Sequence, residues 1–574
     1  MRAALAAAIV AAGAVTAAAQ YRTHNDRLDP PSGTSRAAWN TRAAYLREHI
    51  LASAGLLPLP RREALNPLVS GEIRHQDYVV AKVRFESLPS FYVTGNLYRP
   101  IGDGPFPAIV SPHGHWTNGR LENTDVASIP GRAINLARQG FVVFTYDMIG
   151  YGDSRQLTHT FGSSRDALWG LSLGGLQLWN SIRSLDFLET LPYVRQDGFG
   201  ATGESGGGTQ TFLLAAVDSR VTVAAPVNMI SLKMQGGCIC ENLPGLRLDT
   251  NNVELAATIA PRPMLMVSAP GDWTSETLER EYPAMRAIYA LFGAESKVHA
   301  VRMDAPHNYN KDSREAVYAW MARWMQNAPA DVKRPEKSFT PDPMTDLLVF
   351  YGSLRPENAI TAEQLTAQWI DAARAQLATA DRATLHAALR HALGFAAEPA
   401  AAMPTEGKIS RVVVAASVEP GIETALKRAG FQVRPVRFTT FDAEAAGKVR
   451  HFYTYNRTAA SQRVNDIVTA MRQSPNAVLV AGGDAALPAL LAAAITPVRR
   501  AIVDVDGFDP SDDGAFLERV YIPGLRRAGD LQTAASMMTG EIVVHDGRDR
   551  FKVNGVRVER EPLTPRAIVA LATK

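Results

Sequence analysis

The chain contains 574 residues, of which 46% are hydrophobic, and its formal net charge is only +3. A chain of this length can bury two or three separate hydrophobic cores, which predicts a globular protein of several domains. Lysine and arginine are dispersed and form no basic run, so nucleic acid is not an expected partner.

Residues 1–19 have the features of a secretory signal peptide. Arg2 supplies a positive charge, residues 3–15 form an apolar run of small side chains, and residues 17–19 offer an Ala-x-Ala cleavage site. An alanine-rich membrane anchor is the alternative, but the run is shorter than the roughly 20 residues that span a bilayer. We therefore expect export to a periplasm or out of the cell, with no transmembrane segment after the signal.

The chain after the signal predicts a lead-in and then a sheet. Residues 20–70 contain a helical pattern at 36–54, and two antiparallel strands follow. Strands and helices then alternate with short loops up to residue 327, which is typical of a mostly parallel sheet covered on both faces. The expected strands are 78–85, 91–98, 108–111, 141–146, 199–202, 221–227, 263–269 and 298–303, and the expected helices are 129–139, 173–191, 209–217, 276–292 and 313–325.

The remainder of the chain predicts a second α/β domain. Residues 328–408 comprise a Pro- and Lys-rich linker at 328–343, helices at 361–393 and a further flexible join. From 409 to 574 the alternation resumes, with a hairpin expected at 551–558 around Asn554-Gly555. The expected strands are 411–416, 431–436, 451–455, 477–481, 501–505 and 541–545.

The stretch Gly203-Glu204-Ser205-Gly206-Gly207 matches G-x-S-x-G, the nucleophile elbow of α/β hydrolases. In that motif a strand turns sharply into a helix, and glycines on either side of the serine allow the close approach of the two. A buried strand is expected just before Ser205 and a helix just after it. The alternative is a Gly-rich turn with an incidental serine.

A serine nucleophile needs a base, and the base needs a carboxylate that holds its tautomer. In this fold the order along the chain is serine, acid, histidine. Asp272 follows the strand at 263–269 and His307 follows the strand at 298–303, so both are expected at the carboxyl end of the sheet. Glu276 is the competing acid but is better placed to cap the next helix, and Asp304 lies too near His307 in sequence.

The tetrahedral intermediate of acyl transfer also needs two N–H donors. The backbone N–H of Gly206 is one expected donor. The other should come from the loop after the strand at 108–111, where His115 is the first candidate and Trp116 the next. His113 and His115 could instead be a metal pair, but an H-x-H pattern alone is weak evidence, and no metal or cofactor is predicted.

The two cysteines, Cys238 and Cys240, lie in a long insertion at 228–258. A disulfide across C-x-C closes a small, strained ring, although an exported protein would permit one. Two thiols in a loop, or one labile bridge, are favoured over a structural disulfide. A zinc site would need further ligands that the sequence does not obviously supply.

With these features in place, residues 70–326 resemble the acetyl xylan esterase-like branch of the α/β hydrolases, which is related to dienelactone hydrolases. The matching motifs are 112–116, 146–154, 203–207 and 304–310. Dienelactone hydrolases use a cysteine nucleophile, whereas Ser205 indicates ester hydrolysis. Such family members commonly act on acylated plant polysaccharides, so the resemblance implies acetylated xylan or a similar glycan ester as the substrate; a small ester is also an expected substrate class.

Residues 409–574 look similar to a degenerate copy of the same fold. Residues 478–486 occupy an elbow-like junction, but Ala485 stands where a nucleophile would, and residues 541–545 resemble the strand before the acid. A half without a nucleophile should be inert; dimerisation, glycan contact and shaping of the cleft remain its possible roles. The test of this duplication is whether residues 409–574 superpose on residues 105–326; a different sheet order would exclude it.

Other functions are weighed against the esterase. A serine peptidase of the prolyl oligopeptidase type shares the fold and the triad order but usually carries a β-propeller, and no repeats of blade length precede the hydrolase region here. A glucuronoyl esterase has closer chemistry and would need a basic residue near the uronate. A non-catalytic binding protein is disfavoured for the first half by the complete triad, and the oligomeric state stays open.

Overall fold

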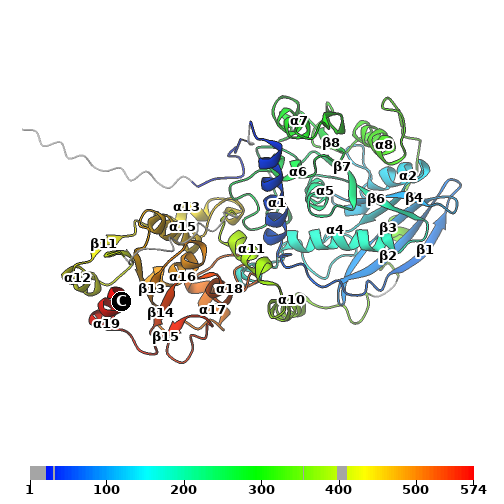
Figure 1. Cartoon of the computed structure of the whole chain (residues 1–574). Coiled ribbons are helices and arrows are strands. Elements are labelled where there is room, and N and C mark those ends of the chain that lie inside the picture. The colour runs from blue at the N-terminus through cyan, green and yellow to red at the C-terminus, as the bar shows by residue number, and fades with distance from the viewer. Residues whose placement is uncertain (1–20, 30–32, 235, 353–354, 397–409) are drawn as a thin grey trace, which may run out of the picture.

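The computed structural model describes residues 21–29, 33–234, 236–352, 355–396 and 410–574. The expected signal peptide therefore lies outside the described residues, as does the whole of the expected join at 398–407. Within the described part of the chain, no helix is long and apolar enough to cross a membrane. Figure 1 shows two α/β units, one after the other along the chain, with helices α10 (Ala362–Leu377) and α11 (Arg382–Ala392) lying where they meet.

The first unit is built on a nine-stranded sheet of order β1-β2-β3-β5-β4-β6-β7-β8-β9. The neighbouring strands β1 and β2, β2 and β3, and β3 and β5 are antiparallel. All other neighbouring strands of the sheet, from β5 to β9, are parallel. This is the α/β-hydrolase order that the sequence predicts. The strands are β1 (Leu68–Arg74), β2 (Tyr78–Leu88), β3 (Phe91–Pro100), β4 (Phe106–Pro112), β5 (Val142–Tyr146), β6 (Val194–Glu204), β7 (Val221–Val227), β8 (Met264–Ser268) and β9 (Val298–Arg302).

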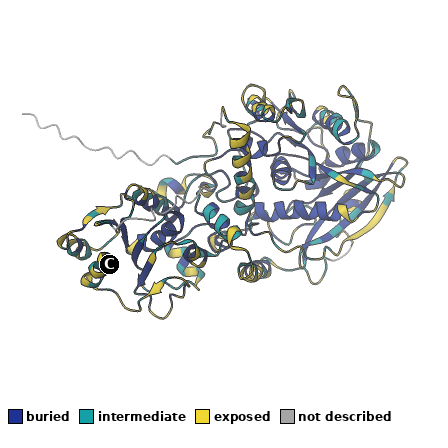
Figure 2. Cartoon of the chain, viewed as in Figure 1, coloured by how far each residue is buried: buried dark blue, intermediate teal, exposed yellow. Residues whose placement is uncertain are grey.

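Helices cover both faces of this sheet because its strands are apolar on both sides. In β4, Ala108 and Val110 pack into the core that contains α4 and α5, whereas Ile109 packs into the opposite core beneath α2 and α8. Figure 2 shows α4 and α5 almost wholly buried, whereas edge strand β1 is exposed. The helices are α1 (Arg36–Ser53), α2 (Ile129–Arg138), α3 (Ser164–Leu168), α4 (Leu173–Glu189), α5 (Gly206–Val217), α6 (Asn252–Ala257), α7 (Tyr282–Ala290) and α8 (Lys311–Met325).

The second unit has a six-stranded parallel sheet of order β11-β10-β12-β13-β14-β15. Its strands are β10 (Val412–Ala416), β11 (Gln432–Pro435), β12 (Val478–Ala481), β13 (Arg500–Asp504), β14 (Glu541–His545) and β15 (Arg557–Val558). Its helices are α12 (Pro420–Arg428), α13 (Ala443–Gly447), α14 (Phe452–Tyr455), α15 (Ala459–Arg472), α16 (Ala486–Ile495), α17 (Asp513–Arg519), α18 (Asp530–Met537) and α19 (Pro565–Thr573).

The six strands of this sheet have the same order as β4 to β9 of the first sheet. In both, the first of the six strands lies between the second and the third, and the others follow in chain order. The sheet order therefore does not exclude the duplication, but other doubly wound folds share that order, so the duplication stays a prediction. The elbow position itself needs correcting. Gly483, with φ +51°, is the residue with a left-handed backbone after β12, and Ala485 is a buried residue of the following turn.

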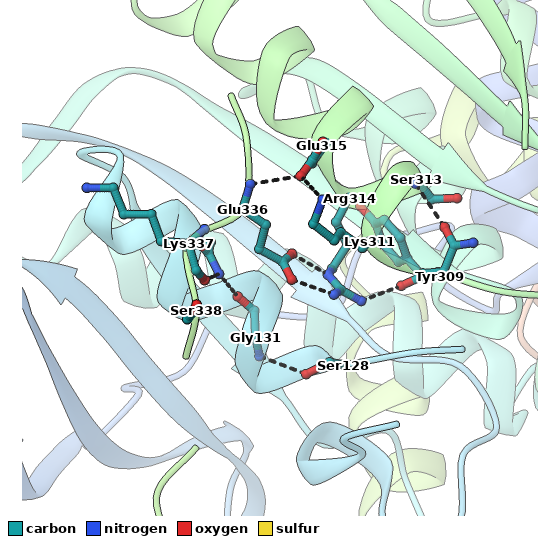
Figure 3. Close-up of polar contacts among 12 residues, drawn as sticks. Ser128, Gly131, Tyr309, Lys311, Ser313, Arg314, Glu315, Glu336, Lys337 and Ser338 are labelled. Atoms are coloured by element: carbon teal, nitrogen blue, oxygen red, sulfur yellow. Dashed lines mark hydrogen bonds and ion pairs between the residues drawn. The ribbon is translucent and has the colours of Figure 1, made fainter. Parts of the chain in front are cut away.

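Two further expectations are wrong. Residues 452–455 form helix α14, not a strand, and the hairpin at 551–558 is replaced by the two-residue strand β15, which pairs parallel to β14. Residues 328–343, the expected linker, contain no helix or strand but are packed against the first unit. They cross α2 and α8, where Glu336 pairs with Arg314 and the N–H of Lys337 donates to Asn135 (Figure 3).

Candidate active site

Ser205 stands between β6 and α5 with φ 55° and ψ −121°, the strained conformation that the elbow motif requires. Gly203 and Gly207 have no room for a larger side chain. A Cβ on Gly203 would lie 2.3 Å from the carbonyl oxygen of Pro112, and a Cβ on Gly207 would lie 2.4 Å from the same atom. The backbone thus presents the serine at the carboxyl end of the central strand.

His307 and Asp272 meet at the same end of the sheet. The Nδ1 atom of His307 lies 2.8 Å from Oδ2 of Asp272, whose side chain is only 2% exposed. The other oxygen, Oδ1, accepts the backbone N–H of Thr274 at 2.7 Å, so this carboxylate is held in place on both sides. A carboxylate can only accept from Nδ1–H, which leaves Nε2 of His307 free to take up a proton.

Two indole rings flank the imidazole of His307. The ring centroid of Trp273 lies 4.5 Å from that of His307, and the Trp116 centroid lies 6.4 Å away with the rings 26° from parallel. Trp116 also approaches the elbow, since a Cβ on Gly114 would lie 3.1 Å from its Nε1 and 3.2 Å from Cβ of Ser205. Trp116 therefore lies close to both His307 and Ser205.

The loop that carries His307 is connected to the start of α8. The carbonyl of Tyr309 accepts from Nη1 of Arg314 at 2.9 Å, and the hydroxyl of Tyr309 lies 2.7 Å from that of Thr202 in β6 (Figure 3 shows the arginine contact). Arg314 in turn makes two bonds of 2.7 Å to the carboxylate of Glu336. A residue after α8 is thus connected, through Arg314, to the loop that carries His307.

The hydrogen-bond partners of the backbone N–H groups near Ser205 indicate which of these groups could bind an oxyanion. Gly206 is the first residue of α5, and the first N–H groups of a helix have no partner within the helix. In the loop after β4, the N–H of Gly114 donates to Glu204 and the N–H of Trp116 donates to the carbonyl of Gly114. His115 is therefore the remaining candidate donor in that loop, and Trp116 is ruled out in this conformation.

Glu204, which the sequence did not single out, is a fully buried carboxylate beside Ser205. It accepts from Nη1 of Arg132 at 2.8 Å, from Nε1 of Trp116 at 2.6 Å and from the N–H of Gly114 at 3.1 Å. Burial alone would raise its pKa, but the charge of Arg132 and these hydrogen bonds outweigh it, and the pKa is lowered. Glu204 therefore stays ionised and connects the elbow with the loop that carries His115.

Glu276, the competing acid, does not contact His307. It lies at the start of a π-helical turn (Thr277–Glu281) and pairs with Lys233 at 3.1 Å and with Arg27 at 2.5 Å. Its side chain makes no capping bond, so the expected capping role is wrong as well.

Four potential metal ligands also gather near the elbow: His115, His159, Cys238 and Cys240. The Nε2 atom of His115 lies 3.1 Å from Sγ of Cys240, and Nε2 of His159 lies 3.2 Å from Sγ of Cys238. Both cysteines are free. The sequence had offered the histidine pair and the cysteine pair only as separate, weak signals, and it had not singled out His159.

Comparisons with known proteins agree with this fold. The structure of the methylesterase BT1017 superposes with a TM-score of 0.52 and 31% sequence identity, over 60% of this chain and 78% of that one. YtaP of Bacillus subtilis (strain 168), a protein named as a hydrolase, is 25% identical over 256 residues, which is 42% of this chain and 84% of YtaP. No family model matches the chain.

An acetyl xylan esterase from Paenibacillus sp. R4 aligns at 16% identity, with a TM-score of 0.35, over 52% of this chain and 97% of the esterase. The chain belongs to the family of BT1017. It is a carboxylic ester hydrolase of the serine type with the α/β-hydrolase fold.

Proposed function

We propose that the protein hydrolyses esters through Ser205, His307 and Asp272. The observation that carries this proposal is the contact of 2.8 Å between His307 Nδ1 and Asp272 Oδ2, at the sheet end where Ser205 has its strained backbone. Nε2 of His307 accepts the hydroxyl proton of Ser205 as Oγ attacks the ester carbonyl. The same nitrogen then protonates the leaving alcohol, and it next removes a proton from the water that cleaves the acyl-enzyme.

The negative oxygen of each tetrahedral intermediate would be held by the N–H groups of Gly206 and His115. Each such donor typically contributes about 10²- to 10³-fold in rate. Glu204 supports this arrangement because it contacts the loop on both sides of His115, through Gly114 and Trp116. The carboxylate is thus a positioning group and does not touch the substrate.

For the substrate we propose an ester of a carbohydrate, with an acetylated polysaccharide such as acetyl xylan as the first choice. The indoles of Trp116 and Trp273 support this choice, because their rings flank the base and offer apolar faces beside the reacting atoms. Export through residues 1–19 would bring the enzyme to such a polymer outside the cytoplasm.

The methyl ester of a uronic acid is the second candidate. It is favoured by the 31% identity to a methylesterase. The two candidates differ in which side of the ester is small: an acetyl ester has a small acyl group and a sugar alcohol, whereas a methyl ester has a sugar acid and releases methanol. A glucuronoyl ester shares the bulky acid with the second candidate.

The test compares products released from defined polymers. Acetylated xylan should release acetate, and methyl-esterified uronan should release methanol if the second candidate holds. Ser205→Ala should abolish either activity, whereas Ser417→Ala, in the loop after β10 of the second unit, should leave it unchanged. A Ser205→Ala protein that keeps full activity would refute the assignment, and cleavage of peptides alone would favour the peptidase alternative.

For the second unit we propose a non-catalytic role. Gly483, at the position that corresponds to Ser205, has no side chain that could attack a carbonyl. The unit instead contacts the insertion at 228–258: the N–H of Gly245 donates to Tyr453 at 2.7 Å and that of Arg247 to Thr454 at 3.0 Å. These bonds connect α14 with the insertion that carries both cysteines.

A further inference from the structure

The cluster of His115, His159, Cys238 and Cys240 has the composition and the spacing of a metal site. The four potential ligand atoms come from three separate segments and all lie within 4.8 Å of one another. A tetrahedral zinc ion with Zn–N near 2.0 Å and Zn–S near 2.3 Å would place its ligand atoms about 3.3–3.8 Å apart. The N···S distances of 3.1 and 3.2 Å are close to that range.

We propose that His115, His159, Cys238 and Cys240 bind one Zn²⁺ ion in a closed tetrahedral site beside the active centre. Two thiolates and two imidazoles are the donor set that zinc prefers in structural sites. Four protein ligands leave no open position for water or substrate, so the ion would position the chain and would not act as a Lewis acid.

The surroundings of His159 are those of a metal ligand. Its Nδ1 lies 2.6 Å from the carbonyl oxygen of Ile149, which can only accept, so Nδ1 carries the proton. The lone pair of Nε2 is therefore directed toward Cys238. A backbone carbonyl that fixes the tautomer in this way is the usual outer partner of a zinc-bound histidine.

The cysteine loop is likewise shaped around the site. The carboxylate of Glu241 accepts the N–H groups of Gly237 and Cys238 at 2.8 and 2.9 Å, which folds the loop back on itself.

The ion would also fix the active-site loop. A Cβ on Gly206 would lie 2.6 Å from Cε1 of His115, so the ligand imidazole packs directly on the residue after the nucleophile. The backbone N–H of His115 is the proposed second oxyanion donor. Loss of the metal should therefore lower kcat more than it raises KM; this effect rests on the proposed function, whereas metal binding does not.

The test measures metal in the full-length protein, purified under reducing conditions and loaded with Zn²⁺. We expect one zinc per chain by elemental analysis, and Co²⁺ substitution should give thiolate-to-cobalt charge transfer and the intense visible bands of a tetrahedral site. His159→Gln should weaken zinc binding against a chelator at least about 100-fold, because losing an outer partner alone costs 10- to 100-fold. His299→Gln, a histidine of β9 outside the cluster, should bind zinc like wild type.

Two controls separate the possible failures. Ser205→Ala should lose ester hydrolysis and still hold one zinc, so the site and the mechanism are tested independently. If the Cys238→Ser/Cys240→Ser protein does not fold, the His159→Gln measurement and the cobalt spectrum of wild type decide. Wild-type protein that binds no zinc after loading, or that contains a Cys238–Cys240 disulfide under reducing conditions, would overturn the proposal.

Discussion

Nε1 of Trp116 donates a hydrogen bond of 2.6 Å to Oε1 of Glu204, the residue directly before Ser205. The same indole lies beside the imidazole of His307. One side chain therefore connects the nucleophile elbow, the loop with the proposed oxyanion donor and the base.

Trp116→Phe should lower kcat about 10- to 100-fold with little change in KM. The ring that faces His307 is kept, but Glu204 loses a donor to a charged group, and such bonds contribute about 1.5–3 kcal/mol. Steady-state kinetics on p-nitrophenyl acetate measures this effect. Trp324→Phe, in α8, is the matched control, and an equal loss in both variants would contradict the role given to Trp116.

Asp272→Asn should lower kcat by about 10⁴-fold while leaving the melting temperature nearly unchanged. The amide can donate its N–H to Nδ1 of His307 and thereby favour the wrong tautomer, in which Nε2 carries the proton. Glu276→Gln should leave kcat within about twofold, because Glu276 pairs with Lys233 and Arg27 and not with the base. A large loss of kcat in Glu276→Gln with little loss in Asp272→Asn would instead identify Glu276 as the acid of the triad.

Glu204→Gln should destabilise the fold by about 3–5 kcal/mol, because it leaves the guanidinium of Arg132 buried without its counter-charge. The pH dependence follows from the lowered pKa of Glu204. The folded state binds this proton less readily than the unfolded chain, so the contribution is complete above the ordinary glutamate pKa of about 4.3 and is lost as the pH falls below it.

Chemical denaturation of wild type and Glu204→Gln between pH 3 and pH 7 measures both effects. The difference in unfolding free energy between the two proteins should shrink toward low pH. If this difference grew as the pH falls, the pKa of Glu204 would not be lowered by folding, and the account of an ionised Glu204 would be contradicted.

Glu336→Gln should lower both stability and kcat, although the residue lies after the last helix of the first unit. The Arg314–Glu336 pair is 5% exposed on each side, and Arg314 also holds the carbonyl of Tyr309, two residues after the base. We expect a loss of about 1–3 kcal/mol in thermal or chemical unfolding. Glu444→Gln removes an exposed pair with Lys448 and should cost less than about 0.5 kcal/mol.

The fold of the first unit could be predicted from the sequence alone. Its strands and helices are marked by patterns of apolar residues within short stretches of the chain. Apolar runs mark the strands, and Ser205, Asp272 and His307 each follow one of them in the order that the α/β-hydrolase fold uses. The contact between Asp272 and His307 could be anticipated because the carboxyl ends of parallel strands meet at one edge of the sheet.

What the sequence could not indicate depends on contacts between distant segments. Arg132 and Glu204 are 72 residues apart, and nothing local marks them as a pair. His115 and Cys240 are separated by 125 residues, so a metal cluster was not visible in either motif. Residues 451–455 have the aromatic composition of a strand, but residues 452–455 form helix α14, whose backbone carbonyls accept hydrogen bonds from the insertion of the first unit.

The central claim is that Ser205 is the nucleophile, and covalent labelling tests it most directly. A fluorophosphonate probe should attach once per chain, with loss of esterase activity in proportion, and peptide mass spectrometry should locate the adduct on Ser205. Asp272→Asn should slow the labelling, because a misoriented His307 cannot take the serine proton. An adduct on any other residue, or labelling of the Ser205→Ala protein at the wild-type rate, would contradict the account.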